Sequence, residues 1–191
     1  MLTNYYSNPE EKEYVPGNPI FEKLKDCYYA VSEVQYVSKE FLEVIGSPLI
    51  LKMASDIEIM AKTVLESSQE TPPKKQLFLY SGHDMNIASV LAVLGQWREG
   101  CFVDKFIEKP VSKECQNFPQ NGSTIIFELL QNPQNFKDLY IAVSYNKRYI
   151  KVCSDSEVLP GKKYVCPFSI FLTSIKEKTH LDWESLCKIN V

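Results

Sequence analysis

Apolar side chains recur every three or four residues in two stretches of the first third of the chain. The first stretch, between residues 19 and 44, predicts one or two helices. The second follows Ser47-Pro48, which supply a helix N-cap and a proline at the first helical position, and it predicts an amphipathic helix ending near Ser68. The apolar positions are Phe21, Leu24, Tyr28 and Val31 in the first stretch, and Leu49, Met53, Ile57, Met60 and Val64 in the second.

The spacing changes in the middle of the chain to a short, continuous apolar run. Pro72-Pro73 ends the second helix, and residues 76–80 then follow without polar alternation. Such a run is typical of a strand covered on both faces in a largely parallel sheet. The turn Ser81-Gly82-His83-Asp84 comes next, and residues 87–94 predict a helix closed by Gly95. A strand, a tight turn and a helix in this order form half of an α/β crossover.

The rest of the chain predicts three strands, a last helix and a tail. The strands cover residues 123–130, 139–145 and 149–152, the helix runs from 166 to about 176, and the tail covers 181–191. The sequence therefore indicates an α/β fold in three parts. These are a loop or arm over residues 1–18, a helical segment over 19–70, and an α/β part over 71–191.

The composition of the 191 residues is that of an ordinary globular protein, with 45% hydrophobic and 24% charged positions. The net charge of −3 comes without a run of basic residues, so the basic footprint of a nucleic-acid-binding protein is missing. The longest apolar stretches fall short of the roughly 20 residues that span a bilayer. We therefore expect a soluble protein that neither binds nucleic acid nor spans a membrane.

The number and positions of the cysteines indicate in which cellular compartment the protein folds. Their number is even and they lie in predicted loops and at element ends, which is typical of a disulfide-bonded protein from an oxidising compartment. The alternative is a cytosolic protein with buried free thiols. The first residues lack the basic start and apolar core of a signal peptide, so we expect that a segment precedes Met1. The cysteines are Cys27, Cys101, Cys115, Cys153, Cys166 and Cys187.

Candidate chemistry lies in the turn Ser81-Gly82-His83-Asp84. Ligands of open α/β sheets bind outside the carboxyl ends of the strands, and the start of the next helix favours an anion such as phosphate. A histidine binds phosphate oxygens, and an adjacent acid protonates a leaving group. The alternative is that Asp84 only caps the helix while His83 packs or bonds locally.

Other chemistries fail on the same sequence. Gly95 and Gly100 have the glycine spacing of a phosphate-binding loop, but Cys101-Phe102 replaces the required Lys and Ser or Thr. The chain has no G-x-S-x-G nucleophile motif and no C-x-x-C pair. Beyond His83, the only histidine is His180 in the tail. We therefore expect no metal site and no cofactor.

Several motifs carry a family resemblance. Leu77-Phe78-Leu79-Tyr80-Ser81-Gly82-His83-Asp84 resembles the C-terminal signature of the histidine acid phosphatases, in the branch with the prostatic, lysosomal and insect venom enzymes. The resemblance extends over residues 46–187. Its other motifs are Ile45-Gly46-Ser47-Pro48-Leu49-Ile50, Phe127-Glu128-Leu129, Leu159-Pro160-Gly161 with Cys166-Pro167, and Asp182-Trp183 with Cys187.

The resemblance implies a fold, a reaction and roles for two residues. The fold is the sheet portion of a three-layer α/β/α phosphatase core, with residues 19–70 as part of a helical cap. The reaction is hydrolysis of a small phosphomonoester through a phosphohistidine, in which His83 binds the phosphate and Asp84 donates a proton to the leaving alcohol. The resemblance also implies a secreted or lysosomal protein, and the sequon at Asn121 is a weak indication of a glycan.

The resemblance suggests cysteine partners as well. Cys115 resembles a cysteine that bonds back to the helical insertion, which makes Cys27 its candidate partner. Cys153 and Cys166 flank a loop that a disulfide between them would close. The tail cysteine of the family, matched here by Cys187, pairs with a cysteine in the other half of the enzyme.

The chain departs from the family pattern at the nucleophile. The nucleophilic histidine of the family lies in an Arg-His-Gly tripeptide with further arginines near it, and this sequence contains no such tripeptide. Its two arginines, Arg98 and Arg148, adjoin no histidine and are expected on the solvated surface. His180 does not match the nucleophile. The resemblance therefore implies the C-terminal half of the enzyme, inactive alone.

Three functional hypotheses remain open. The first is an acid phosphatase of which this chain is a part. The second is a truncated, non-catalytic secreted protein that binds phosphate groups or a partner chain, and the third is a chain without a stable function. Because the predicted strand over residues 76–80 lacks its neighbour, we also expect poor folding, a homodimer or association with the missing N-terminal half.

Overall fold

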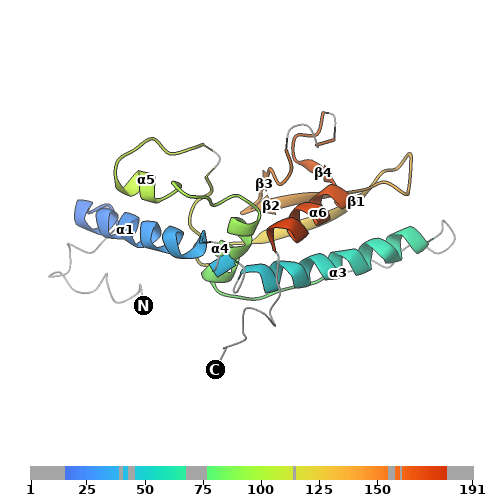
Figure 1. Ribbon diagram of the computed structural model, residues 1–191, viewed down its shortest axis with the longest axis horizontal. Coiled ribbons are helices and arrows are strands. Elements are labelled where there is room, and N and C mark those ends of the chain that lie inside the picture. Colours follow the sequence, from blue (N-terminus) through green and yellow to red (C-terminus); the bar gives the residue numbers. More distant parts are fainter. Residues whose placement is uncertain are drawn as a thin grey trace, which may run out of the picture.

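The computed structural model describes residues 16–38, 41–42, 46–67, 77–113, 115–154, 158–159 and 161–179. Figure 1 shows a small sheet flanked by helices, with one long helix on either side of the short central helix α4. The helices are α1 (Pro19–Tyr36), α3 (Ser47–Glu66), α4 (Asp84–Val93), α5 (Val103–Phe106) and α6 (Phe168–Lys178). The strands are β1 (Ile125–Gln131), β2 (Leu139–Tyr145), β3 (Arg148–Ile150) and β4 (Val165–Pro167).

The two long helices confirm the helical pattern of the first third. The helix α1 starts with proline after Asn18, whose side-chain oxygen accepts the Ile20 N–H at 2.8 Å. The start of α3 differs from its prediction. Gly46 is the N-cap, and the Ser47 hydroxyl donates a hydrogen bond back to the Leu42 carbonyl at 2.7 Å. Ser47 therefore bonds back to Leu42 and does not cap the helix.

The sheet is antiparallel. Its central strand β2 pairs with β1 along one side, and with β3 and β4 along the other. The turn between β2 and β3 places Asn146 and Lys147 at φ values of 48° and 68°, which are typical of a tight two-residue hairpin. The prediction of a largely parallel sheet is thus wrong for the described residues, because short hairpin connections bring successive strands together in opposite directions.

Residues 77–80 form no strand. Leu77 and Leu79 are 87% and 88% exposed, and no described residue makes a backbone hydrogen bond to this segment. The predicted strand is therefore wrong for the described chain. A strand needs a neighbour that supplies backbone donors and acceptors, and the apolar pattern that predicts the strand does not say whether that neighbour is present.

The amides of residues 77–80 are expected to exchange with solvent rapidly, since they have no backbone hydrogen bond to a described residue. Hydrogen exchange followed by mass spectrometry checks this, with the peptide that contains β2 as the protected internal reference. Strong protection of residues 77–80 in a monomeric sample would show that the segment finds a partner within one chain.

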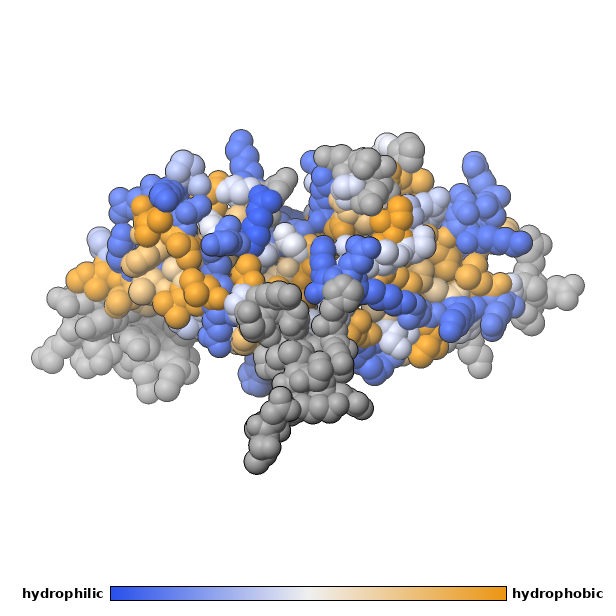
Figure 2. Space-filling model, viewed as in Figure 1, coloured by the Kyte–Doolittle hydropathy of each residue, from blue (hydrophilic) through white to orange (hydrophobic). Residues whose placement is uncertain are grey.

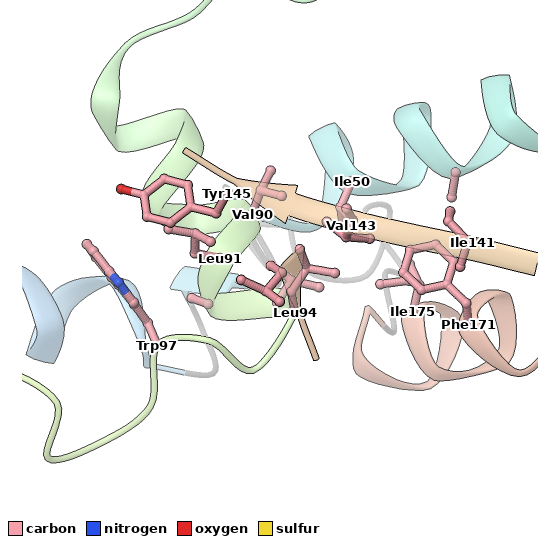
Figure 3. Packing of buried hydrophobic residues seen from close by; sticks show 14 of the residues in the cluster. Ile50, Val90, Leu91, Leu94, Trp97, Ile141, Val143, Tyr145, Phe171 and Ile175 are labelled. Atoms are coloured by element: carbon pink, nitrogen blue, oxygen red, sulfur yellow. The ribbon is translucent and has the colours of Figure 1, made fainter. Parts of the chain in front are cut away.

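The hydrophobic core lies on one face of the sheet. Ile141 and Val143 of β2 are fully buried, and Phe127 of β1 meets Phe171 of α6 with 6.2 Å between ring centres. Figure 3 shows these β2 side chains between residues of α4 and α6. On the other face Ile126 stays exposed. The α/β class is confirmed, with helices over one face of the sheet in the described part of the chain.

The helix α4 is the centre of the fold. Its residues from Ala88 to Val93 are all buried, and it contacts both α1 and α3. The predicted helix over residues 87–94 is therefore confirmed, and its mostly apolar composition suits burial on every side. The chain leaves α4 at Gly95, where φ is +74°, so the predicted glycine end is confirmed.

The segment that carries α5 is fastened to α1 by a buried carboxylate. Glu33 is only 1% exposed, and its oxygens accept the backbone N–H groups of Gly100 at 2.6 Å, of Phe102 and of Val103 at 3.2 Å. The ring of Tyr29 stacks on Phe118 with 4.4 Å between ring centres. These contacts fix which face of α1 points inward.

Two disulfide bonds close loops in the second half of the chain. Cys153–Cys166 is confirmed, and Cys101 pairs with Cys115 across a Cα–Cα distance of 5.5 Å. The expected partnership of Cys115 with Cys27 is therefore wrong, because Cys101 lies close enough to Cys115 in the loop that carries α5, and Cys27 is a free thiol. The arm up to residue 15, the tail and Cys187 lie outside the described residues.

Within the described chain, no helix is both long enough and apolar enough to cross a bilayer.

Candidate phosphate site at the start of α4

His83 stands at the exposed N-terminal end of α4. It is the N-cap residue, with extended backbone angles, and its own N–H donates to the Asn86 side-chain oxygen at 2.9 Å. The side-chain oxygen of Asn86 thus supplies a local hydrogen bond at this turn. The turn is therefore braced by the helix itself, and the His83 side chain is presented to solvent.

Asp84 is the first residue of α4 and is half-buried. One carboxylate oxygen, Oδ1, accepts the Met85 N–H at 2.8 Å. This bond is the local role that the capping alternative assigns to Asp84. The second oxygen has no hydrogen bond to a described residue. One carboxylate oxygen of Asp84 is thus engaged locally, and the other is not.

The first turn of α4 offers few free donors. The Met85 N–H is held by Asp84, and the N–H groups of Asn86 and Ile87 point to the His83 carbonyl at 3.0 and 3.4 Å. Among the first N–H groups only that of Asp84 has no described acceptor. The expected cradle of free N–H groups is therefore reduced to one donor and the positive end of the helix dipole.

Tyr36 lies close enough to Asp84 for their charges to interact. Burial raises the pKa of Tyr36, and the charges of Tyr28 and Asp84 add to the rise. Tyr36 comes from α1, which contacts α4. Sequence reasoning missed this residue, since it lies 48 positions before Asp84 and only the packing of α1 against α4 brings the two together.

Residues 77–80 lead into the site and are anchored at one point. The Tyr80 hydroxyl donates to Asp56 of α3, and Asp56 also accepts a hydrogen bond from Lys52 one turn earlier. Burial and then the bond to Asp56 raise the pKa of Tyr80 to about 12. Lys52, and after it Tyr80, hold the pKa of the Asp56 carboxyl below its ordinary value of 3.8.

This anchor predicts a pH dependence. Because the pKa of Asp56 is lower in the folded chain, its contacts contribute stability above pH 3.8, and this contribution is lost as the pH falls through the lowered pKa. Urea unfolding should therefore show a larger free energy of unfolding for the parent than for Asp56→Asn at neutral pH. The difference should shrink below pH 3.8, and a difference that stays constant with pH would contradict the assignment.

The arginines do not complete a phosphate clamp at His83. Arg98 follows the C-terminal end of α4, and that end lies about 15 Å from the start of this ten-residue helix. The Arg98 guanidinium donates to the Ser112 hydroxyl at 2.7 Å. Arg148 is exposed at the start of β3, as expected for a surface residue. His180 lies outside the described residues. Within the described chain, no cluster of three or more His, Cys, Asp or Glu side chains is arranged to hold a metal ion.

A family comparison decides the relationship. The model of the histidine phosphatase superfamily (branch 2) matches residues 2–154. The chain belongs to this superfamily. Histidine phosphatases generally hydrolyse phosphate esters, and the match includes His83 and Asp84. It starts earlier than the resemblance of the motifs, which begins at residue 46, and ends before β4 and α6. No curated protein matches the chain.

Proposed function

We propose that this histidine phosphatase chain is part of an acid phosphatase that hydrolyses small phosphomonoesters. In the complete enzyme a histidine nucleophile attacks phosphorus and the ester P–O bond breaks. Asp84 gives its proton to the departing alkoxide, and water then releases inorganic phosphate from the phosphohistidine. The observation that carries the proposal is the adjacent pair His83 and Asp84 at the exposed start of a buried helix, within the matched family region.

His83 and the start of α4 would stabilise the negative charge of the phosphoryl group. The transferring phosphoryl group spreads negative charge over three oxygens, and catalysis depends on donors that face them. His83 supplies one such donor, and the dipole of α4 favours the same anion. A carboxyl group acts as a proton donor in its protonated form, which favours acidic conditions for this chemistry.

We propose that this chain alone is inactive. Its sequence contains no Arg-His-Gly tripeptide, so neither the nucleophile nor its neighbouring arginines come from these 191 residues. The exposed, unpaired residues 77–80 are the surface that the segment with the nucleophile would cover. The same missing tripeptide favours the second candidate function, a non-catalytic secreted protein that binds phosphate groups or a partner chain.

The deciding experiment is the intact mass and the N-terminal peptide map of the native protein. A species of about twice 22.0 kDa that yields an Arg-His-Gly peptide supports the phosphatase. A mature species of 22.0 kDa or less contradicts it and supports the non-catalytic protein. The two disulfides fit a secreted or lysosomal protein. A mass loss after enzymatic deglycosylation, absent in Asn121→Gln, would support the glycan.

Asp84→Asn in the complete enzyme should slow substrates in proportion to the basicity of their leaving group, because a poor leaving group needs the proton most. We expect a loss of about 10²–10⁴-fold for alkyl phosphates and a much smaller loss for nitrophenyl phosphate. Measurement of kcat over a series of leaving groups checks this. Equal slowing across the series would assign Asp84 a positioning role only.

A further inference from the structure

The helix α1 carries an apolar seam on its outward face. The seam consists of Ile20, Leu24, Cys27, Val31 and Val34, spaced by four, three, four and three residues. Its four aliphatic members are 52%, 54%, 62% and 67% exposed. This spacing is the one with which a helix pairs with another helix. Figure 2 shows hydrophobic surface at the end of the molecule where Figure 1 places α1.

The contacts on the opposite side of α1 hold the seam outward. Glu33 accepts three backbone N–H groups from the segment that carries α5. Lys105 reaches Asp26 at 2.7 Å on the same side, and at the edge of the seam Lys23 reaches Glu108 at 3.0 Å. The inward face is thus occupied by specific polar partners, and a rotation of α1 that buried the seam would break them.

Cys27 lies at the centre of the seam. Among the described cysteines it alone has no disulfide partner, and its side chain is half-buried. An unpaired cysteine beside paired ones suggests a bond between molecules. The seam and the thiol are separate observations, one of packing and one of covalent chemistry, and both point to the same face.

We propose that a second copy of this chain covers the seam, with the two α1 helices antiparallel and a disulfide joining the two Cys27 residues. The order of the seam is nearly the same in both directions about Cys27. Ile20 then lies opposite the partner subunit's Val34, and Leu24 opposite the partner subunit's Val31. A second copy therefore supplies an apolar seam that packs against the first seam and a thiol that lies opposite Cys27. This interface belongs to α1 and does not depend on the proposed phosphatase chemistry.

The dimensions of paired helices allow the bond. Helix axes pack about 8–10 Å apart and Cα atoms lie about 2.3 Å from each axis, so facing Cα atoms come within about 3.4–5.4 Å. Disulfides join Cα atoms about 4.4–6.8 Å apart. In an antiparallel pair the two helix dipoles point in opposite directions, so the positive end of each helix lies beside the negative end of the other. Lys23 beside the seam is held by Glu108, so like charges do not meet across the axis.

The bond forms by thiol–disulfide exchange with a small disulfide such as oxidised glutathione. The Cys27 thiolate attacks one sulfur, which forms a mixed disulfide and releases one glutathione thiol. The partner's Cys27 thiolate then attacks the mixed disulfide, which joins the chains and releases a second glutathione thiol. Two protein thiols are oxidised and one glutathione disulfide is reduced. The seam alone is small for a stable interface, and the covalent bond makes its contacts intramolecular.

The first test incubates the full chain with a glutathione redox buffer and measures mass without reductant. We expect a covalent species of twice 22.0 kDa that Cys27→Ser abolishes and Cys187→Ser retains. Val31→Asp should lower the yield of this species at least tenfold. Ile59→Asp, at a residue of α3 that is 52% exposed, should leave the yield unchanged and serves as the matched control. Circular dichroism confirms that both variants fold.

The second test determines the direction of the helices. In the Cys27→Ser background, chains with Ile20→Cys and chains with Val34→Cys should cross-link when mixed and much less when kept apart. A species that persists in Cys27→Ser, a monomer in all conditions, or equal loss in Val31→Asp and Ile59→Asp would overturn the interface. Cross-linking of Ile20→Cys chains with themselves would overturn the antiparallel arrangement. Association through residues 77–80 is distinguished because it survives Val31→Asp.

Discussion

Replacement of Glu33 by alanine is expected to destabilise the chain by about 3–5 kcal/mol. The carboxylate of Glu33 is 1% exposed and accepts three backbone N–H groups, those of Gly100, Phe102 and Val103. Hydrogen bonds to a charged group contribute about 1.5–3 kcal/mol each, and donors left buried without a partner add a cost. The start of α5 has no other side-chain cap. The loss is a large fraction of the roughly 5–15 kcal/mol by which a domain is stable.

Urea unfolding of the parent and the variant gives the difference in the free energy of unfolding. Glu22→Ala is the matched control, because Glu22 lies on the same helix and pairs with Lys25 in a partly exposed ion pair. That solvent-screened pair is expected to contribute little to the free energy of unfolding. If Glu33→Ala and Glu22→Ala cost the same, the buried carboxylate does not fasten the α5 segment to α1.

Local patterns predicted most of the helices and three of the strands, β1, β2 and β3. The helical spacing and Pro48 gave α3 to within two residues at its end, and the apolar run before Gly95 gave α4. These features depend on neighbours in the sequence, so the sequence contains the necessary information. The strands β1 and β2 were predictable for the same reason, because they follow each other along the chain with only a loop between them.

The failures share a different cause. The apolar run over residues 77–80 fits a buried strand, but its state depends on a partner elsewhere in space. Cys115 pairs with Cys101, and no spacing rule chooses among the partners of a cysteine. Glu33 is a charged residue in a fully buried place, which exposure preferences would put on the surface.

In the candidate site, too, the residues with a local sequence signal were predictable, and those brought in by tertiary packing were not. His83 and Asp84 were predicted because a turn before a buried helix is a local signal, and the helix start is where the structure has them. Tyr36 and Asp56 come from other helices and reach the site or its leading segment only through tertiary packing. The expected donors of the first helical turn were over-counted, because Asp84 and the His83 carbonyl already engage them.

His83→Ala in the complete enzyme is expected to lower kcat by about 10²–10³-fold, the typical loss when one donor to a developing negative charge is removed. Because His83 is exposed at the start of α4, the change removes a surface side chain without leaving a cavity in the core. Stability should therefore change little, which separates a loss of catalysis from a loss of fold.

Steady-state kinetics with one phosphomonoester across the pH range checks the prediction, together with the binding of inorganic phosphate as a competitive inhibitor. His180→Ala is the control, since it removes the chain's other histidine, and it should keep the parent kcat. Weaker phosphate inhibition together with a lower kcat assigns His83 to the phosphate itself. An unchanged kcat would remove His83 from the site and leave Asp84 to be tested on its own.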